Sequence, residues 1–367
     1  MSDNLRRYRA IKRALRQLYP NVLRGNQMRH LDTLAGLISG IVGSKSTHLP
    51  QIANKVPDQT QLDSRVKRFT RWVSNAEIEA EIYFLPYAEN LVWQLASQPL
   101  TLVMDGSTVG RGCLVLLMSV VYQHRALPLA WLVVQGRKGH FPETSHLELL
   151  AQVHALLPAQ AQVTFLGDGE FDGVGLQDTL DGYGWHYVCR TAKNIILCRA
   201  GHEFAFETLP LEPDTRVSLP QVTLRQQGYG PVQAIGWWGA GYAEPIYLLT
   251  NLADADAACE WYRKRARIET FFSDQKSRGF NLHKSHLSDP QRLARLMIAA
   301  CLAYIWLIDL GVRALHDKWR RWIHRTARCD LSLFQLGLRL LEHLLNQGKR
   351  IPVSFQLTIP PVTKSVR

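Results

Sequence analysis

The chain has 367 residues, of which 43 are Lys or Arg and 31 are Asp or Glu, so its formal net charge at pH 7 is +12. Its length and its 46% content of apolar residues exclude a disulfide-stapled miniprotein, a disordered tail and a collagen-like fibre, and they indicate two or three domains. A basic excess of this size indicates a polyanionic partner, such as nucleic acid or an anionic membrane surface. Charge alone leaves the function open.

The basic residues concentrate in two segments. The first thirty residues carry eight Lys and Arg against one Asp, and residues 261–330 carry fifteen against six acidic residues. The N-terminus lacks the apolar segment of a secretion signal, and the longest apolar run, about twelve residues from Met297 to Ile308, is shorter than the ~20 residues that a bilayer requires. The six cysteines have no regular spacing, so reduced thiols are expected. We expect a soluble cytoplasmic protein.

Residues 1–95 have apolar positions at the three- and four-residue spacing of helices. Within this segment, a short helix, a break at Pro57 and Asp58 and a basic second helix suggest a unit like a helix-turn-helix. The second helix carries four cations that either contact DNA or form a solvated basic face: Arg65, Lys67, Arg68 and Arg71. We expect residues 1–95 to form a helical DNA-binding domain.

From residue 100 the pattern changes to that of strands. The runs LTLVMDGS, RGCLVLLMSVVYQ and ALPLAWLVVQ predict three successive strands, and a helix, a strand, a helix and the strand WHYVCRT follow. This is the order of a ribonuclease-H-like core, in which parallel strands reached through crossover helices extend the first strand of an antiparallel meander. The predicted fold class is therefore α/β, with this core over residues 96–193 and 252–285.

Two further segments complete the predicted organisation. Residues 194–251 contain short strands with Gly and Pro between them and little helical periodicity, which predicts a β-rich insertion. A last core helix is expected from about Ala255 to Lys276. Residues 286–367 are expected to form a helical C-terminal region, and residues 330–367 match no motif.

Two aspartates end apolar strands of the predicted core, Asp105 in TLVMDGST and Asp168 in VTFLGDGEFD. If these strands are parallel neighbours, both carboxylates emerge at one edge of the sheet, where they repel each other unless a cation lies between them. Mg²⁺ and Mn²⁺ prefer such oxygen ligands, and two ions about 3.5–4 Å apart promote phosphoryl transfer. A single Asp at a strand end is more often a turn former or a helix cap, but two on adjacent strands favour a site.

A third carboxylate, Glu269, lies in EWYRKRARIETFFSDQKSRGF together with Tyr262, Arg265 and Lys276. On one continuous helix these four residues would fall within roughly 60° of a single face. Such a face can be a salt-bridged surface in contact with solvent. It can equally be a metal-binding carboxylate flanked by groups that hold phosphate.

The spacing Y-x2-R-x3-E-x6-K, after an Asp in the first strand and a second Asp in a G-D-x-E-F-D context, resembles the YREK signature of the DDE transposases of the bacterial insertion sequence four family. The similarity covers roughly residues 30–320. It implies a DNA transposase that cleaves the ends of an insertion sequence and joins them to target DNA by metal-dependent phosphoryl transfer, in a cut-and-paste reaction. Asp105, Asp168 and Glu269 match the catalytic, metal-binding triad, and Tyr262, Arg265 and Lys276 match the phosphate-contacting residues.

The resemblance also implies cofactors and partners. These are two Mg²⁺ ions, for which Mn²⁺ can substitute, and double-stranded DNA as terminal inverted repeats and as target. A homodimer on paired ends is expected, at the bacterial nucleoid, with no membrane and no nucleotide cofactor.

In that family the β-rich insertion helps to hold a DNA end. Trp237 and Trp238 are the candidates for stacking on a base turned out of the duplex, and the alternative is that at least one of them packs inside the insertion. Arg190 and Lys193 are either phosphate contacts or solvated charges. His140 either assists near the metals or serves as a capping or core histidine.

Two other functions remain open from the sequence. A ribonuclease-H-like DNA nuclease would cut DNA without joining it. A domesticated, non-catalytic regulator would bind DNA through the basic surface alone, although it would have no need of clustered carboxylates. The sequence contains no Walker or dinucleotide-binding motif, so an ATP-driven mechanism is not supported.

Overall fold

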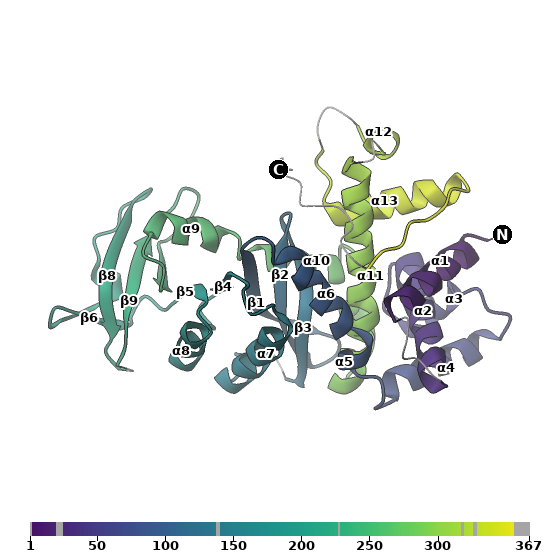
Figure 1. Ribbon diagram of the computed structural model, residues 1–367, viewed down its shortest axis with the longest axis horizontal. Helices are drawn as coiled ribbons and strands as arrows, with labels where there is room; N and C mark the ends of the chain where they lie inside the picture. Colours follow the sequence, from purple (N-terminus) through teal and green to yellow (C-terminus); the bar gives the residue numbers. More distant parts are fainter. Residues whose placement is uncertain are drawn as a thin grey trace.

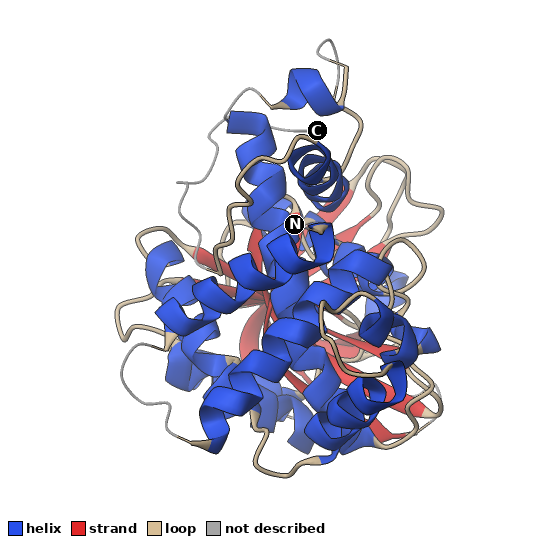
Figure 2. Cartoon of the chain, turned by 90° about the vertical axis from the view of Figure 1, so that its right-hand side faces the viewer, coloured by secondary structure: helices blue, strands red, loops and turns tan. Residues whose placement is uncertain are grey.

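The computed structural model describes residues 2–19, 25–136, 140–226, 228–316, 319–325 and 329–355. Helices at the N-terminal end, a mixed sheet and a β-rich insertion follow one another along the longest axis (Figure 1). The long helix α11 (Pro290–His316) lies between the sheet and the N-terminal helices. Figure 2 shows the helices of both chain ends in front of the sheet. This arrangement of a mixed sheet with helices at both ends confirms the predicted α/β fold class.

The described part of residues 1–95 contains six helices. The N-cap Ser2 begins the first of them, because its hydroxyl accepts a hydrogen bond from the backbone N–H of Leu5 (3.4 Å). Apolar side chains of the second helix are buried against α11 and the first helix. The helices are α1 (Asp3–Leu18), α2 (Asn26–Ser44), α3 (Leu49–Asn54), α4 (Leu62–Ser74), α5 (Ala80–Tyr83) and α6 (Leu85–Leu95).

The core sheet has the predicted strand order. Its first strand pairs antiparallel with the second and parallel with the fourth, and the fourth pairs parallel with the fifth. The spatial order β3-β2-β1-β4-β5 is that of a ribonuclease-H-like core. The elements are β1 (Leu100–Val109), β2 (Cys113–Tyr122), β3 (Arg125–Gln135), α7 (Glu143–Leu156), β4 (Val163–Gly167), α8 (Val174–Gly182) and β5 (His186–Arg190).

The sheet does not end at β5 but continues into the insertion. Strand β10 (Ile246–Thr250) pairs antiparallel with β5, and the order then runs β10-β9-β8-β6-β7, so the sheet has ten strands within the described residues. A small separate core that includes Phe206 and Tyr247 supports the outer strands. Backbone hydrogen bonds therefore join the insertion to the core. The outer strands are β6 (Ile196–Arg199), β7 (His202–Ala205), β8 (Arg216–Leu224) and β9 (Tyr229–Trp237).

The single helix expected from Ala255 to Lys276 is wrong, because the chain forms two helices, α9 (Ala255–Arg263) and α10 (Arg267–Gln275). Between them the backbone N–H of Arg265 bonds to the carbonyl of Tyr262 (2.9 Å), three residues back instead of four. Such a 3₁₀ turn advances the chain by ~120° per residue, so the spacing argument for one continuous helical face does not apply.

Helix α11 is the central helix of the fold. By length and composition alone its 27 residues could cross a membrane, but 89% of its apolar window is buried inside the protein. The short apolar run predicted from the sequence is therefore part of a longer helix whose neighbours are α2, α4, α13 (Leu333–Asn346) and the sheet. A short helix, α12 (Arg320–Ile323), lies between α11 and α13 in the sequence.

Helices α11 and α13 cross closely at Gly337, which predicts that a larger residue there destabilises the protein. A Cβ on Gly337 would overlap the carbonyl oxygen of Leu307, because the two backbones touch there. We expect Gly337→Ala to force the helices apart and to lower the free energy of unfolding by about 1–3 kcal/mol in urea denaturation. Gly182→Ala, at the end of α8 with no atom within 4 Å, is the control that should keep wild-type stability or gain slightly. Equal urea midpoints for both variants would contradict the close crossing.

Candidate active site

The two strand aspartates lie level with each other at one edge of the sheet. Strands β1 and β4 pair in parallel up to Val103 and Leu166, and Asp105 and Asp168 each follow two residues later. Strand β1 itself continues to Val109 along β2. The sequence predicted that Asp105 ends its strand, and this is wrong. Asp105 lies within β1, at the point where the pairing of β1 with β4 stops.

The guanidinium of Arg265 lies among three carboxylates. Its Nη1 is 3.8 Å from Asp105 Oδ2 and 3.5 Å from Asp168 Oδ2, while its Nη2 donates a hydrogen bond to Glu269 Oε1 at 2.6 Å. The Arg265 side chain is only 17% exposed, whereas that of Glu269 is 59% exposed. The break between α9 and α10 thus places the arginine against the strand carboxylates, and Glu269 reaches it from the surface.

The electrostatics of this cluster are those of crowded carboxylates. Burial raises the pKa of Asp105 to about 7, and the neighbouring Asp168 raises it as well, while Arg265 and the N–H of Gly106 (2.8 Å) lower it. A carboxyl with such a pKa is only partly ionised at neutral pH. The repulsion is of the kind that a bound cation relieves.

Two further residues of the Y-x2-R-x3-E-x6-K pattern lie beside the cluster. Lys276 follows α10, and its Nζ donates a hydrogen bond to the hydroxyl of Ser107 (2.7 Å), which is two residues beyond Asp105 on β1. Burial lowers the pKa of Lys276, and Asp105 raises it. Tyr262 is buried on α9, and burial raises the pKa of its phenol to about 12. All four residues of the pattern therefore lie in the carboxylate cluster or beside it, although they do not share one helix.

Two cavities flank the carboxylates. One of about 350 Å³ is lined by Asp168, Arg190 and Lys193, and a second of about 370 Å³ is lined by Glu269, Tyr262, Arg265 and again Arg190. Arg190, at the end of β5, therefore faces both sides of the site. Lys193 is exposed and pairs with Glu207 at 3.7 Å.

Glu170 is a residue of the site to which the sequence interpretation gave no role. Its backbone N–H donates to Asp168 Oδ1 (3.0 Å), so the turn after β4 fixes that aspartate. Its own carboxylate accepts from the N–H of Phe141 (2.5 Å) and contacts His146 Nε2 (3.4 Å). Burial raises the pKa of Glu170, but these contacts outweigh it and lower the pKa. The G-D-x-E-F-D context was the only sequence signal.

His140 lies at the mouth of this site. Its Nδ1 is 3.5 Å from Glu170 Oε2, and its side chain is 83% exposed. It also lines the same cavity as Asp168. The structure thus places His140 at the surface and not in the core.

Trp237 and Trp238 are packed to different extents. Trp237 is 7% exposed, and its ring packs against Tyr242 and the guanidinium of Arg263 at centroid distances of 5.3 Å and 5.1 Å. Of the two alternatives left open for this pair, Trp237 therefore fits the packed one, because Arg263 of α9 and Tyr242 cover its ring. Trp238 is half-buried, and its indole N–H donates to the carbonyl of Tyr242. Tyr242 is the exposed aromatic residue of this loop.

The four cations of α4 fall into two pairs. Arg65 donates to the carbonyl of Val56 (2.9 Å) and Arg68 to Asp58 (2.6 Å), so both hold the turn that precedes the helix. Lys67 and Arg71 are exposed. These last two are therefore the cations of α4 that are available to a partner.

A ribonuclease-H-like sheet with carboxylates gathered at one edge defines an enzyme of phosphoryl transfer on nucleic acid. Residues 101–306 match the family described as the transposase DDE domain. This match spans more than half of the chain, which therefore belongs to that family and is a DNA transposase, an enzyme of DNA cleavage and strand transfer. Transposases of this family use divalent metal ions.

Other comparisons add less. Among solved structures, the chain is similar to the piggyBac transposase in a synaptic complex with hairpin DNA, with 13% sequence identity over 99% of this chain and 83% of that chain and a TM-score of 0.47. No curated protein matches the chain in sequence.

The donor set fits a divalent metal. Asp105, Asp168 and Glu269 offer only carboxylate oxygens, the ligands that hard cations prefer, and they already converge on one positive group. Within the described ranges, no three His, Cys, Asp or Glu side chains lie close enough together to hold one ion as placed. Arg265 takes the central position instead.

Proposed function

We propose that this chain is the transposase of a bacterial insertion sequence of the insertion sequence four family, with Asp105, Asp168 and Glu269 as its catalytic, metal-binding residues. The observation that carries this proposal is the convergence of the three carboxylates, from β1, from the turn after β4 and from α10, on the guanidinium of Arg265. A DNA-binding protein without catalysis has no use for carboxylates gathered in this way.

The carboxylates would hold two magnesium ions, for which manganese can substitute. Asp105 would contribute to both, with Asp168 to one and Glu269 to the other. Bound ions of this kind lower the pKa of water and offset negative charge on the departing oxygen. The chain's own residues position the DNA: Arg265 and Lys276 donate hydrogen bonds to phosphate oxygens, and Tyr262 lines the cavity beside them.

The proposed assembly follows from the number of ends. An element has two ends and each chain provides one triad, so a homodimer that pairs the terminal inverted repeats would place one triad at each end. We propose that residues 1–95, the β-rich insertion (194–251) and the helical region 286–367 hold DNA around the core (96–193 and 252–285), in the cytoplasm at the nucleoid. Arg190, Lys193, Lys67 and Arg71 are the exposed or cavity-lining cations that support this.

The test is an assay on linear DNA that carries the inverted repeats flanking the gene. With Mg²⁺ we expect cleavage at the repeat ends and joined strand-transfer products with unlabelled target DNA, and with EDTA we expect neither. Cleavage without joining would contradict the proposal in favour of a nuclease. A gel shift without cutting would contradict it in favour of a regulator.

A further inference from the structure

A second basic site lies away from the carboxylates. A cavity of about 890 Å³, here called the α1–α13 groove, is lined by one face of α1, by the C-terminal part of α13 and by residues 348–353. Figure 1 shows α1 and α13 on the opposite side of α11 from β1 and β4. The groove is therefore separate from the candidate active site.

One face of α1 carries the positive charge of the groove. Arg6, Arg9 and Arg13 line it at three- and four-residue spacing, so they follow one another along about 10 Å of the helix. Arg313, Lys349 and Arg350 face them from the C-terminal side. Of the described residues that line the groove, these six are basic and none is acidic.

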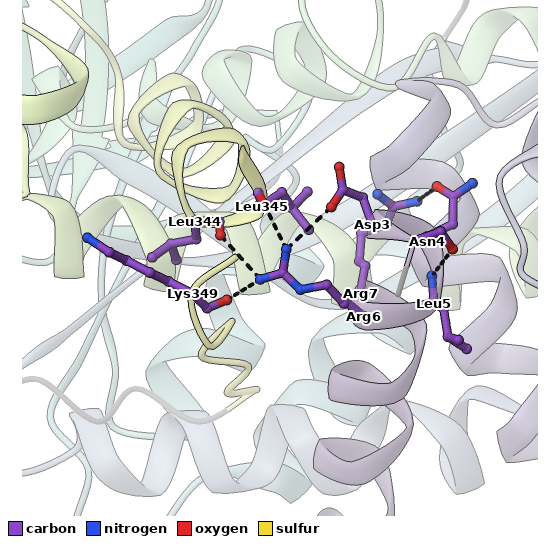
Figure 3. Close-up of polar contacts among 9 residues, drawn as sticks. Asp3, Asn4, Leu5, Arg6, Arg7, Leu344, Leu345 and Lys349 are labelled. Atoms are coloured by element: carbon purple, nitrogen blue, oxygen red, sulfur yellow. Dashed lines mark hydrogen bonds and ion pairs between the residues drawn. The ribbon is translucent and has the colours of Figure 1, made fainter. Parts of the chain in front are cut away.

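Two arginines of α1, Arg6 and Arg7, bind backbone carbonyls of neighbouring helices. Arg6 donates to the carbonyls of Leu345 (2.7 Å) and Leu344 (3.3 Å) and to that of Lys349, and so it joins α1 to the end of α13 (Figure 3). Arg7 is buried and donates to the carbonyl of Ser39 (2.8 Å), and so it joins α1 to α2. Arg6 and Arg7 therefore hold α1 in place against α13 and α2.

Three of the remaining cations are exposed along the groove. Arg13 and Arg350 have no hydrogen-bond or ion-pair partner within the ranges that the structure describes. Lys349 lies over the ring of Trp319 at 4.8 Å, which holds its ammonium at the wall of the groove. By contrast, Lys12 and Arg16 on the neighbouring face of α1 are both paired with Asp32. The charge of Arg13 is thus directed into the groove, whereas those of Lys12 and Arg16 are paired outside it.

We propose that the α1–α13 groove binds the phosphate backbone of double-stranded DNA, without reading its sequence, at a position remote from the cleaved phosphate. Basic side chains in a row, in a groove whose described lining residues include no carboxylate, suit a line of phosphodiester anions. Contacts of this kind position DNA and carry no sequence information. The inference rests on the membership of the transposase family and not on the assignment of the triad.

Other occupants fit the groove less well. Residues 356–367 contain Lys364 and Arg367 and no acidic residue, so their side chains offer no charge that complements the groove. A second copy of this chain carries a net charge of +12 and would meet six basic residues in the groove, so we expect the proposed homodimer to pair through another surface. An acidic polypeptide matches the charge as well, but DNA is the partner of the transposase family to which the chain belongs. The experiment therefore treats the polypeptide as a competing outcome.

The experiment compares Arg13→Gln and the double variant Arg13→Gln/Arg350→Gln with the matched control Arg16→Gln. Arg16 is on the same helix, but it is paired with Asp32 and does not line the groove. Fluorescence anisotropy in EDTA measures binding to a 30-bp duplex that carries the flanking inverted repeat, to a scrambled duplex of equal length and to a labelled glutamate-rich peptide, at several salt concentrations. Thermal unfolding confirms that each variant is folded.

We expect Arg13→Gln to weaken binding of both duplexes roughly tenfold at 0.1 M salt and to reduce the slope of log K against log salt by about 1, and the double variant by about 2. Arg16→Gln should change neither. Equal slopes for all proteins would overturn the inference, as would a loss confined to the repeat duplex. Tighter binding of the peptide than of DNA, lost in the double variant, would assign the groove to an acidic protein instead. Because EDTA removes divalent metal ions from the binding assay, the results do not depend on whether Asp105, Asp168 and Glu269 are the catalytic residues.

Discussion

Glu269→Gln is expected to reduce strand cleavage by about a thousandfold or more and to leave DNA affinity within about twofold of wild type. Glutamine keeps the shape of the side chain and can still accept the hydrogen bond from Arg265 Nη2, but it removes the negative charge that a divalent ion requires. A loss of several kcal/mol of transition-state stabilisation corresponds to a rate effect of this size. Single-turnover cleavage of a labelled inverted-repeat duplex with Mg²⁺ gives the rate, and anisotropy gives the affinity.

Glu260→Gln is the matched control for this variant. Glu260 makes the same type of contact, an ion pair with Arg263 at 3.0 Å, and its side chain is similarly exposed at 67%. It lies on α9 and lines neither cavity beside the carboxylates. Its substitution should leave the cleavage rate at the wild-type level. Wild-type cleavage by Glu269→Gln would show that the assignment of the triad is incorrect.

Arg265→Met is expected to destabilise the protein without divalent ions and to make it respond more strongly to Mg²⁺. The guanidinium is the positive group that the three carboxylates share, so its removal leaves them to repel one another. We expect the free energy of unfolding in EDTA to fall by about 1–2 kcal/mol, a value reduced for the solvent that reaches Glu269 and Asp168. Thermal unfolding in EDTA and at increasing Mg²⁺ measures both effects.

In the wild-type protein Mg²⁺ has to displace the guanidinium from the carboxylates, whereas in Arg265→Met it does not. The unfolding midpoint of the variant should therefore rise further on addition of Mg²⁺ than that of wild type. Arg263→Met, two residues earlier and paired with Glu260 outside the cluster, should respond as wild type does. An equal rise with Mg²⁺ in all three proteins would mean that Arg265 does not occupy the place of a metal.

The core fold could be predicted because each of its strands and helices is a local feature of the sequence. Each core strand is an apolar run bounded by turn residues, and the order of such runs leaves few topologies for one sheet. The continuation of the sheet from β5 into β10 was not predictable in this way, since Arg190 and Leu248 pair across 58 positions of the sequence. Their pairing depends on the position of the whole insertion.

The candidate site was only partly predictable for the same reason. The residue types and spacing of Tyr262, Arg265 and Glu269 were visible, but the periodicity of a helix does not show where tertiary contacts interrupt it. The 3₁₀ turn at Arg265 forms where its guanidinium can reach Asp105 of β1 and Asp168 in the turn after β4. Likewise, the burial of Trp237 depends on the packing of α9, which no local pattern shows.

The hydrogen bonds that join Arg6 to the end of α13 can form only late in synthesis of the chain. Arg6 leaves the ribosome before its acceptor at Leu344, which follows 338 residues later. At about 5–20 residues per second, synthesis of that stretch takes roughly 20–70 s. During this interval α1 has no contact with α13 and residues 348–353, which form the other side of the groove. A product truncated before residue 344 would thus retain every residue of the carboxylate cluster and still lack one side of the α1–α13 groove.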